Sequence, residues 1–349
     1  MSDGTEFIYD MWYIAAPSAG LARGKTLAKT LLGQKVLLGR DKGGAVFALR
    51  DFCPHRGVPL HYGRFDGTTV ECCYHGWCFD TAGQCTKIPA LPPDSNVDIS
   101  RIRAGSFPCR EVDGNIWVFV PQPGRRELGE LPPLPAPPIP LKGGWRRVAT
   151  MLFPCDIDHA ALGLMDPSHG SWVHASWWWR PHRGVRVKEK KFAPHGLGFR
   201  MLRHAPSANS RAYKLLGGNI ATEITFELPG LRTEHITAGR HHIILLTALT
   251  PIDATSTELH QCMYSTIPLV NLFKPVLTLF GKVFIRQDLD IVRKQAEGLA
   301  SGHPHLMLLG DADQQAVWYN RLKKDYLAAQ KSGAPFTNPV PEKTLRWCS

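Results

Sequence analysis

The stretch Asp51–Trp77, DFCPHRGVPLHYGRFDGTTVECCYHGW, contains two short loops rich in side chains that bind metals. The first loop carries the pattern Cys-x-His, and sixteen residues later the second carries Cys-x-x-His. The four residues are Cys53, His55, Cys72 and His75. Each loop therefore offers one thiolate and one imidazole, and the glycine and proline residues around them permit tight turns.

This mixture of donors distinguishes between kinds of metal site. A structural zinc site usually takes two cysteines from one loop and two histidines from another. A Rieske 2Fe-2S centre has two cysteines on one iron and two histidines on the other. One donor of each kind from each loop favours the Rieske cluster. The residues leave open a zinc site, a disulfide between Cys53 and Cys72, and four unrelated buried residues.

Length and composition indicate two globular domains in a reducing compartment. The chain has 349 residues, which exceeds the length of a typical single domain. Its apolar content of 44% is sufficient for two hydrophobic cores. Its nine cysteines lack the spacing of a secreted disulfide scaffold, so we expect a cytoplasmic protein. We expect neither a signal peptide nor a membrane span, because the most apolar late stretch, residues 267–285, is interrupted by two prolines and two lysines.

The net charge of +11 is unusual for such a composition. The basic residues form no helical stripe, so we expect no nucleic acid partner. The local run Arg180–Lys191 is interpreted as a solvated hairpin or loop. A basic face that attracts an acidic electron-donor protein is the alternative use of this charge.

Turn signals and apolar patterns divide the chain into three parts. Residues 1–120 are predicted to form a small all-β domain, with a hairpin at CFDTAGQC and a closing strand at 114–120. Residues 121–143 contain eight prolines and are predicted to be a linker. Residues 144–349 are predicted to be an α+β domain with an antiparallel sheet and flanking helices. Its expected strands are 220–228, 232–238, 241–250 and 258–267, and its expected helices lie near 156–166, 286–300 and 312–330.

A second set of metal-binding residues lies in this α+β part. The segment GLMDPSHGSWVH at 163–174 supplies Asp166, His169 and His174, and FIRQDLDIVRKQ supplies Asp288 and Asp290. Two imidazoles with one carboxylate are the ligands of non-haem Fe(II) oxygenases.

The spacing of the two histidines sets a condition on the backbone. Residues five apart on a regular helix point about 140° from each other. His169 and His174 can therefore reach one metal only if the helix is irregular between them, and Pro167 and Gly170 are places for such an irregularity. The sequence Asp-Pro-Ser also predicts that a helix begins at Asp166, with this residue as its N-cap.

Together, the two motifs resemble the Rieske non-haem iron oxygenases. The similarity includes CPHRG and CxYHGW, the pattern D-x-x-H-x4-H and the late QDLDIVRKQ, and it looks closest to the group of vanillate and dicamba O-demethylases. Two positions depart from the family pattern. Cys73 stands where proline is usual, and Gly163 stands where many relatives have asparagine.

The resemblance implies roles for particular residues. It implies that Cys53, His55, Cys72 and His75 bind one 2Fe-2S cluster, and that His169, His174 and Asp288 bind one mononuclear Fe(II). It also implies that Asp166 links the iron site to the cluster of a neighbouring subunit, and hence a homotrimer. Asp290 is the competing third ligand. We prefer Asp288 because Gln295 follows it at the family spacing, on a predicted buried stripe with Ile291, Val292 and Leu299.

These assignments predict the oxygenase component of a multicomponent system. It would use O2 and electrons from an NAD(P)H-dependent reductase or ferredoxin to hydroxylate or oxidatively demethylate an aromatic or larger hydrophobic ring substrate. The alternative is a Rieske electron-transfer protein whose C-terminal half only binds a partner.

Apolar residues around the second motif bear on the substrate. Residues 267–285 and the run Trp177–Trp179 favour a bulky hydrophobic substrate, or a loose contact with a membrane surface. Tandem tryptophans are more often core or interface residues than a ligand cage. His159 lies on the helical stripe of Gly163 and Asp166, either as a substrate contact or as a hydrogen-bonded core residue.

Overall fold

The computed structural model describes residues 6–125, 127–174, 186–205, 219–302 and 306–349. Contacts divide the chain into two compact units. The first contains Tyr9–Ala136 and Pro251–Asp253, and the second contains Pro137–Thr250, Ala254–Ser349 and the residues before Tyr9. The division falls inside the proline-rich segment, whose described residues form neither helix nor strand. Among the described residues, no helix is long and apolar enough to span a bilayer.

The first unit is built from β-strands and two short 3-10 turns. Strands β1 (Met11–Pro17), β10 (Asn115–Val120) and β9 (Cys109–Val112) form one sheet, and β2 (Lys25–Leu31), β3 (Gln34–Arg40) and β4 (Val46–Arg50) form a second. A third sheet contains β5 (Arg64–Phe65), β6 (Thr69–Glu71), β7 (Cys78–Asp80) and β8 (Cys85–Lys87). The predicted hairpin is the β7–β8 pair, and the predicted closing strand is β10.

The core of this unit reaches into both metal-binding loops. Cys53 and Cys72 are buried together with apolar side chains of β3, β4, β6 and β7, among them Leu37, Leu49 and Phe79. The packing that holds the sheets together therefore also fixes the two cysteines.

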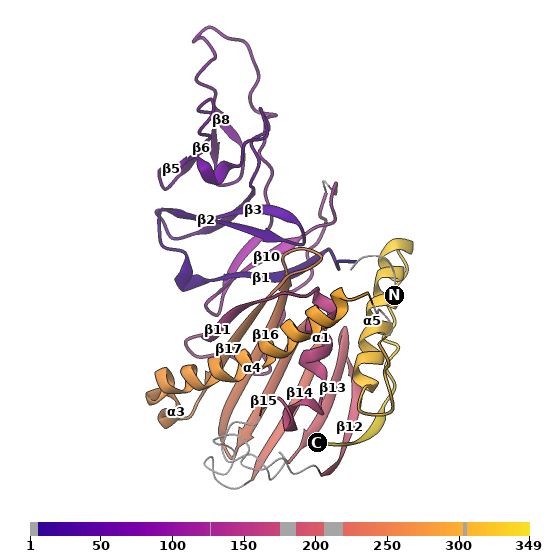
Figure 1. Cartoon of the computed structure of the whole chain (residues 1–349). Helices are drawn as coiled ribbons and strands as arrows, with labels where there is room; N and C mark the ends of the chain where they lie inside the picture. The colour runs from indigo at the N-terminus through magenta and orange to yellow at the C-terminus, as the bar shows by residue number, and fades with distance from the viewer. Residues whose placement is uncertain (1–5, 126, 175–185, 206–218, 303–305) are drawn as a thin grey trace. The chain divides into compact units, whose positions relative to one another are not determined.

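The second unit contains one eight-stranded antiparallel sheet (Figure 1), which confirms the predicted α+β class. Its strand order is β11-β17-β16-β15-β14-β13-β12-β18. The bounds are β11 Arg146–Phe153, β12 Val187–His195, β13 Gly198–His204, β14 Ile220–Glu227, β15 Leu231–Ala238, β16 His241–Pro251, β17 Thr257–Ser265 and β18 Lys343–Cys348. Strands β14 to β17 are the four that the sequence predicted.

The charged run Arg180–Lys191 is not simply a loop. Its last residues, 187–191, belong to β12, which pairs with β13 and with the C-terminal strand β18. Residues 180–185 lie outside the described part of the chain. For residues 187–191 the loop interpretation was wrong, whereas the hairpin interpretation fits the consecutive antiparallel strands β12 and β13. Lysines on a strand with one exposed face resemble a polar loop in sequence.

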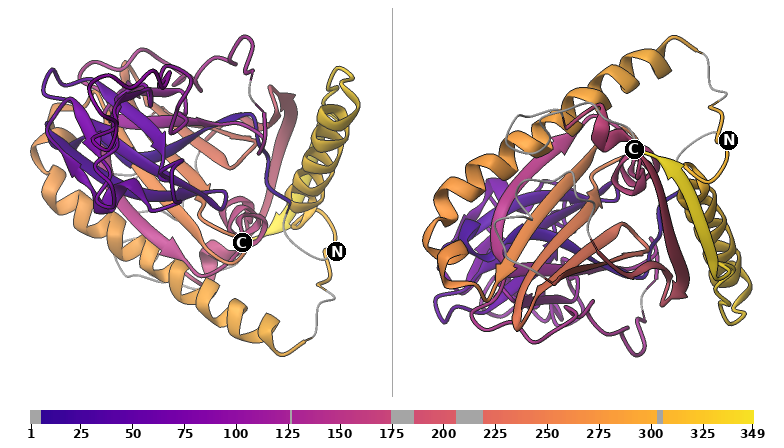
Figure 2. Two further views of the ribbon diagram at one scale, coloured as in Figure 1. Left: turned by 90° about the horizontal axis from the view of Figure 1, so that it is seen from above. Right: turned by 90° about the horizontal axis from the view of Figure 1, so that it is seen from below.

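Among the described residues, four α-helices accompany this sheet: α1 (Ile157–Met165), α3 (Pro268–Leu272), α4 (Lys274–Ala300) and α5 (Gln314–Ser332). Figure 2 shows α4 and α5 along different sides of the sheet. Helix α5 packs Trp318 against Phe192 and Phe199, and its Lys323 binds the Asp158 carboxylate of α1 at 2.6 and 2.8 Å.

Helix α4 begins twelve residues before the predicted start at 286. Pro275, which the sequence analysis treated as an interruption, occupies the first turn, where a proline leaves no hydrogen bond unmade. The helix is therefore long enough to carry both the late aspartates and the apolar segment that precedes them.

A glycine brings α4 close to the edge strand β11. A Cβ atom added to Gly281 would lie 2.5 Å from Cγ1 of Val148, closer than side chains tolerate. Ile285, Leu289 and Val292 continue the buried side of the helix. The sequence thus places a residue without a side chain where the helix and the strand touch.

We predict that Gly281→Ala destabilises the second unit by about 1–3 kcal/mol, because the added methyl group overpacks this contact. Gly298→Ala is the matched control on the same helix, since nothing lies within 4 Å of its added Cβ. It should be neutral or stabilising by up to about 1 kcal/mol. Urea unfolding followed by circular dichroism compares the two, and equal stability of both variants would contradict the prediction.

Candidate metal centres

The two loops of the first unit have the same backbone hydrogen bonds. In the first, the Cys53 N–H donates to the Val58 carbonyl at 2.9 Å, and the Gly57 N–H donates to the Cys53 carbonyl at 2.9 Å. In the second, Cys72 N–H donates to Trp77 at 2.8 Å and Gly76 N–H donates to Cys72 at 3.0 Å. Gly57 and Gly76 have φ of 75° and 68°, a region that favours glycine. Each loop is thus a tight turn beginning at a cysteine.

The donor atoms of these turns fit an iron-sulfur cluster. Burial, and secondarily the neighbouring Cys72 thiol, raise the pKa of Cys53 to about 11, so Cys53 needs a bound cation to become a thiolate. The Nδ1 atom of His55 is buried and makes no hydrogen bond. The His55 and His75 rings lie 4.5 Å apart, and Trp77 stacks on His55 at 4.5 Å. None of the nine cysteines is in a disulfide, which removes the Cys53–Cys72 bridge as an alternative.

In the second unit, the helix that precedes the histidines ends where the sequence predicted a start. Asp166 is the C-cap of α1, and its carboxylate accepts hydrogen bonds from the Ser168 N–H at 2.7 Å and hydroxyl at 2.6 Å. The prediction of an N-cap was wrong, because α1 stops at Met165 and only a short 3-10 turn, His169–Ser171, follows. The predicted irregularity between the two histidines is confirmed.

This irregular turn brings both histidines to the aspartate of α4. The Nε2 atoms of His169 and His174 are 3.2 Å apart. Oδ1 of Asp288 lies 3.2 Å from Nε2 of His174 and 3.7 Å from Nε2 of His169. Ligand atoms about 2.1 Å from one metal and at right angles to each other are roughly 3 Å apart. The three atoms therefore have the separations that one metal ion requires.

Residues of α4 fix the orientation of His174. Nδ1 of this buried ring lies 3.0 Å from Oε1 of Gln287, and the ring of Phe284 stacks on it at 3.6 Å. A hydrogen bond from Nδ1 leaves Nε2 free for a metal. Neither residue was predicted from the sequence. Phe284 stands one helical turn before Asp288 and could have been found from that spacing, whereas Gln287 carries no such signal.

The environment of His169 attracts positive charge. Burial lowers the pKa of this histidine, but the carboxylates of Asp166 and Asp288 outweigh burial and raise it above its ordinary value. Burial raises the pKa of Asp166, and its contacts with His169 and Ser168 outweigh that effect and lower it. Asp166 lies 3.6 Å from Nδ1 of His169. Two carboxylates thus favour a cation between the histidines.

Other predicted residues lie at the edge of this centre or away from it. Asp290 is exposed and lies 3.5 Å from Arg293, as expected of a solvated carboxylate. Ile291 is 43% exposed, so the prediction that it lies on the buried side of the helix was wrong. The buried side of α4 contains Leu289 and Val292. Gln295 and Leu299 are half-buried. Trp177–Trp179 lie outside the described residues.

His159 and Gly163 occupy neighbouring turns of α1. Nδ1 of His159 bonds the Asp156 carboxylate at 2.6 Å, and this bond raises the pKa of the ring. Its Nε2 is buried without a partner. Nothing lies within 4 Å of a Cβ added to Gly163. The histidine is thus hydrogen-bonded on one side, and the glycine leaves open space beside the helix.

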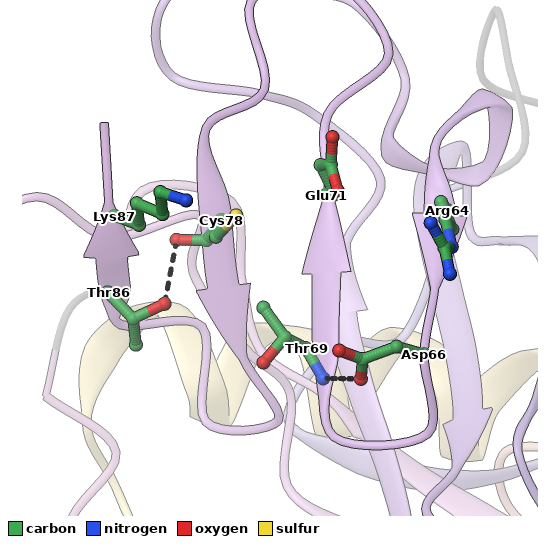
Figure 3. A pocket seen from close by; sticks show the side chains of 7 residues that line it. All are labelled: Arg64, Asp66, Thr69, Glu71, Cys78, Thr86 and Lys87. Atoms are coloured by element: carbon green, nitrogen blue, oxygen red, sulfur yellow. Dashed lines mark hydrogen bonds between the residues drawn. The ribbon is translucent and has the colours of Figure 1, made fainter. Parts of the chain in front are cut away.

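A shallow pocket of about 320 Å³ lies on the sheet β5–β8 (Figure 3). Its lining residues are Arg64, Asp66, Thr69, Glu71, Cys78, Thr86 and Lys87. The lining combines charges of both signs, and the Thr69 and Thr68 N–H groups already bond Asp66 at 2.8 Å. None of the proposed ligands of either centre lines this pocket.

Comparison with known proteins agrees with both centres. Residues 11–108 match the Rieske [2Fe-2S] domain, and residues 163–328 match the vanillate O-demethylase oxygenase C-terminal domain. The chain belongs to the Rieske non-haem iron oxygenases. Within that class, its second domain is of the vanillate O-demethylase type. The Rieske domain carries one 2Fe-2S cluster, and catalytic domains of this class use one mononuclear iron.

Individual relatives are similar over different lengths. Chlorophyllide a oxygenase of Chlamydomonas reinhardtii is 34% identical over an alignment of 350 residues, which covers 96% of this chain and 51% of that protein. The 4beta-methylsterol monooxygenase of Methylococcus capsulatus is 35% identical over 148 residues, 42% of this chain and 38% of that protein. The matches thus span about half or less of these curated relatives.

Solved structures share the fold. Dicamba monooxygenase bound to 3,6-dichlorosalicylic acid superposes with a TM-score of 0.71 at 23% identity, covering 95% of this chain and all of that one. The two proteins therefore share their fold.

We predict that Gln287→Leu weakens iron binding at the second centre roughly 10–100-fold, since the Nδ1–H of His174 loses its acceptor. Gln287→Glu retains an acceptor and should bind iron with near-normal affinity. Competition with a chelator during Fe(II) titration gives the affinities. Asp290→Ala, at an exposed position of the same helix, is the control. Equal affinities of Gln287→Leu and the unchanged protein would show that the hydrogen bond has no such role.

Proposed function

We propose that this chain is the oxygenase component of a multicomponent Rieske system that hydroxylates or oxidatively demethylates a hydrophobic ring substrate. The observation that carries the proposal is the convergence of His169, His174 and Asp288 on one point beside the end of α1. The alternative, an electron carrier with a binding module, has no use for this arrangement. Two imidazoles and one carboxylate leave coordination positions open for dioxygen.

In this proposal, Cys53, His55, Cys72 and His75 hold the cluster, and His169, His174 and Asp288 hold the mononuclear iron. When bound, the cluster supplies single electrons and the iron supplies the dioxygen chemistry. The protein holds the ligands in place. Gln287 orients His174, Asp166 lies against the Nδ1 side of His169, and Phe284 covers one face of the His174 ring. An apolar ring over a ligand excludes water from that side.

The overall reaction is balanced by two electrons from NAD(P)H. One atom of O2 enters a substrate C–H bond to give C–OH, and the other leaves as water with two protons. If the carbon is a methoxy methyl, the hemiacetal loses formaldehyde, and otherwise a hydroxylated product remains. Both outcomes need the same residues, so the choice is made by which carbon the pocket presents.

We propose a bulky, apolar substrate. The side of α4 that carries Asp288 continues through Phe284 to Leu277, residues spaced at four and seven positions on the helix. The space beside Gly163 adds room at the neighbouring helix. By name, the relatives in Chlamydomonas and Methylococcus act on chlorophyllide a and a 4β-methylsterol, both large ring systems.

The partners of this system are proposed on the same basis. A separate NAD(P)H-dependent reductase or ferredoxin would reduce the cluster, and the net charge of +11 suits an acidic donor protein. We propose a homotrimer in which Asp166 connects one subunit's iron to the cluster of the next. We place the protein in the cytoplasm, with weak contact to a membrane surface.

Product analysis tests the proposal. The purified protein, a surrogate reductase and NADH are incubated with a panel of methoxybenzoates, sterols and polycyclic compounds, and O2 uptake is measured with product mass. Asp288→Ala should lower the iron content from about three to about two per chain and abolish product while the cluster spectrum stays unchanged. Three irons in this variant would contradict Asp288 as an iron ligand, whereas two irons in the unchanged protein would support the electron carrier.

The role of Asp166 is tested separately. We predict that Asp166→Asn slows oxidation of the reduced cluster by O2 and substrate roughly 10–100-fold, while the donor still reduces the cluster normally. Stopped-flow absorbance of the iron-loaded trimer measures both steps, and analytical ultracentrifugation measures the assembly. Asp290→Asn should leave both rates unchanged. Unaltered cluster oxidation in Asp166→Asn would remove this residue from the electron path.

A further inference from the structure

The end of α3 and the N-terminal half of α4 present apolar side chains to solvent. Leu272, Val276, Leu279 and Val283, which we call the exposed stripe, are 72%, 49%, 61% and 36% exposed. Phe273 and Phe280 widen it on one side and are also exposed. Single exposed apolar residues are ordinary, but six within twelve positions form a contiguous patch that requires an explanation.

The position of the stripe on the helix separates it from the protein core. Val276, Leu279 and Val283 lie on the side of α4 opposite to Gly281 and Ile285, since residues two apart on a helix point about 200° from each other. Gly281 and Ile285 face the sheet. The stripe therefore faces away from the sheet, and packing among the described residues of the unit leaves it exposed.

Charge restricts what covers this surface. The segment from Gln261 to Gln287 contains no aspartate or glutamate, and it contains Lys274, Lys282 and Arg286. Lys282 and Arg286 are exposed, and on the helix they lie beside the stripe. An apolar face with basic residues at its margin is typical of helices that lie in the surface of an anionic membrane.

We infer that α3 and the N-terminal half of α4 are a docking surface for an anionic lipid bilayer. The apolar side chains enter the acyl boundary while Lys282 and Arg286 bind lipid phosphates. Two copies that meet stripe to stripe would bring the same positive charges together, which is unfavourable. A contact of the stripe with a different surface of a neighbouring copy, as in a cyclic trimer, is distinguished by the sedimentation measurement below. The membrane contact included in the proposed function is thereby assigned to a defined surface and a defined lipid charge. Binding to the membrane itself requires no catalytic turnover.

The test is vesicle flotation with the full-length, cluster-loaded protein. Vesicles contain phosphatidylcholine alone or with an equal part of phosphatidylglycerol. The protein should float with the mixed vesicles at low salt and less at high salt. Leu279→Glu should reduce binding roughly 10–100-fold, the factor for burial of one leucine. Lys282→Gln should reduce binding to mixed vesicles about fivefold.

Val97→Glu is the matched control, because Val97 is an apolar residue of the first unit with similar exposure. It should float like the unchanged protein. Absence of flotation with mixed vesicles, or equal flotation of Leu279→Glu and Val97→Glu, would overturn the inference. Sedimentation of Leu279→Glu is measured in parallel. A change of oligomeric state with unchanged flotation would show that copies of the chain cover the stripe. Neither result depends on whether the protein oxygenates a substrate.

Discussion

The close approach of α4 to β11 is the constraint on which the second unit depends. One residue without a side chain, Gly281, lets the helix lie against Val148, and the buried residues that follow fix its rotation. That rotation decides where Gln287 and Asp288 point. A metal centre assembled from segments more than a hundred residues apart thus relies on the packing of a helix against the edge of a sheet.

The two metal centres use backbone irregularity in different ways. The cluster loops repeat one tight turn, in which a cysteine begins the turn and a glycine with positive φ closes it. The iron site instead uses the interruption of a helix, since α1 ends at Asp166 and a 3-10 turn redirects His169 and His174. In both cases the regular elements hold the ends of the irregular segment, so that the ligands are ordered by their surroundings.

The sequence predicted the features that depend on local pattern. The ligand types and spacings indicated both centres, and alternating apolar residues indicated β14 to β17. It failed where the deciding contact is distant. Gln287 and His174 are 113 positions apart in the sequence, and no sequence pattern near either residue predicts their hydrogen bond. The charged strand β12 looked like a loop because only its pairing with β13 and β18 makes it a strand. The early start of α4 was missed because Pro275 is acceptable only in a first turn.

Helix α4 carries both Asp288, the proposed iron ligand, and most of the exposed stripe, on opposite sides of the helix. Leu279 and Asp288 are nine residues apart, which is about 14 Å along the axis. For a polycyclic molecule with several hundred square ångströms of apolar surface, entry into bulk water from lipid costs on the order of 10 kcal/mol. If α4 lies on a bilayer by this stripe, a substrate dissolved in the lipid would reach the protein without crossing bulk water, so that its supply would depend on its concentration in the bilayer rather than on its solubility in water.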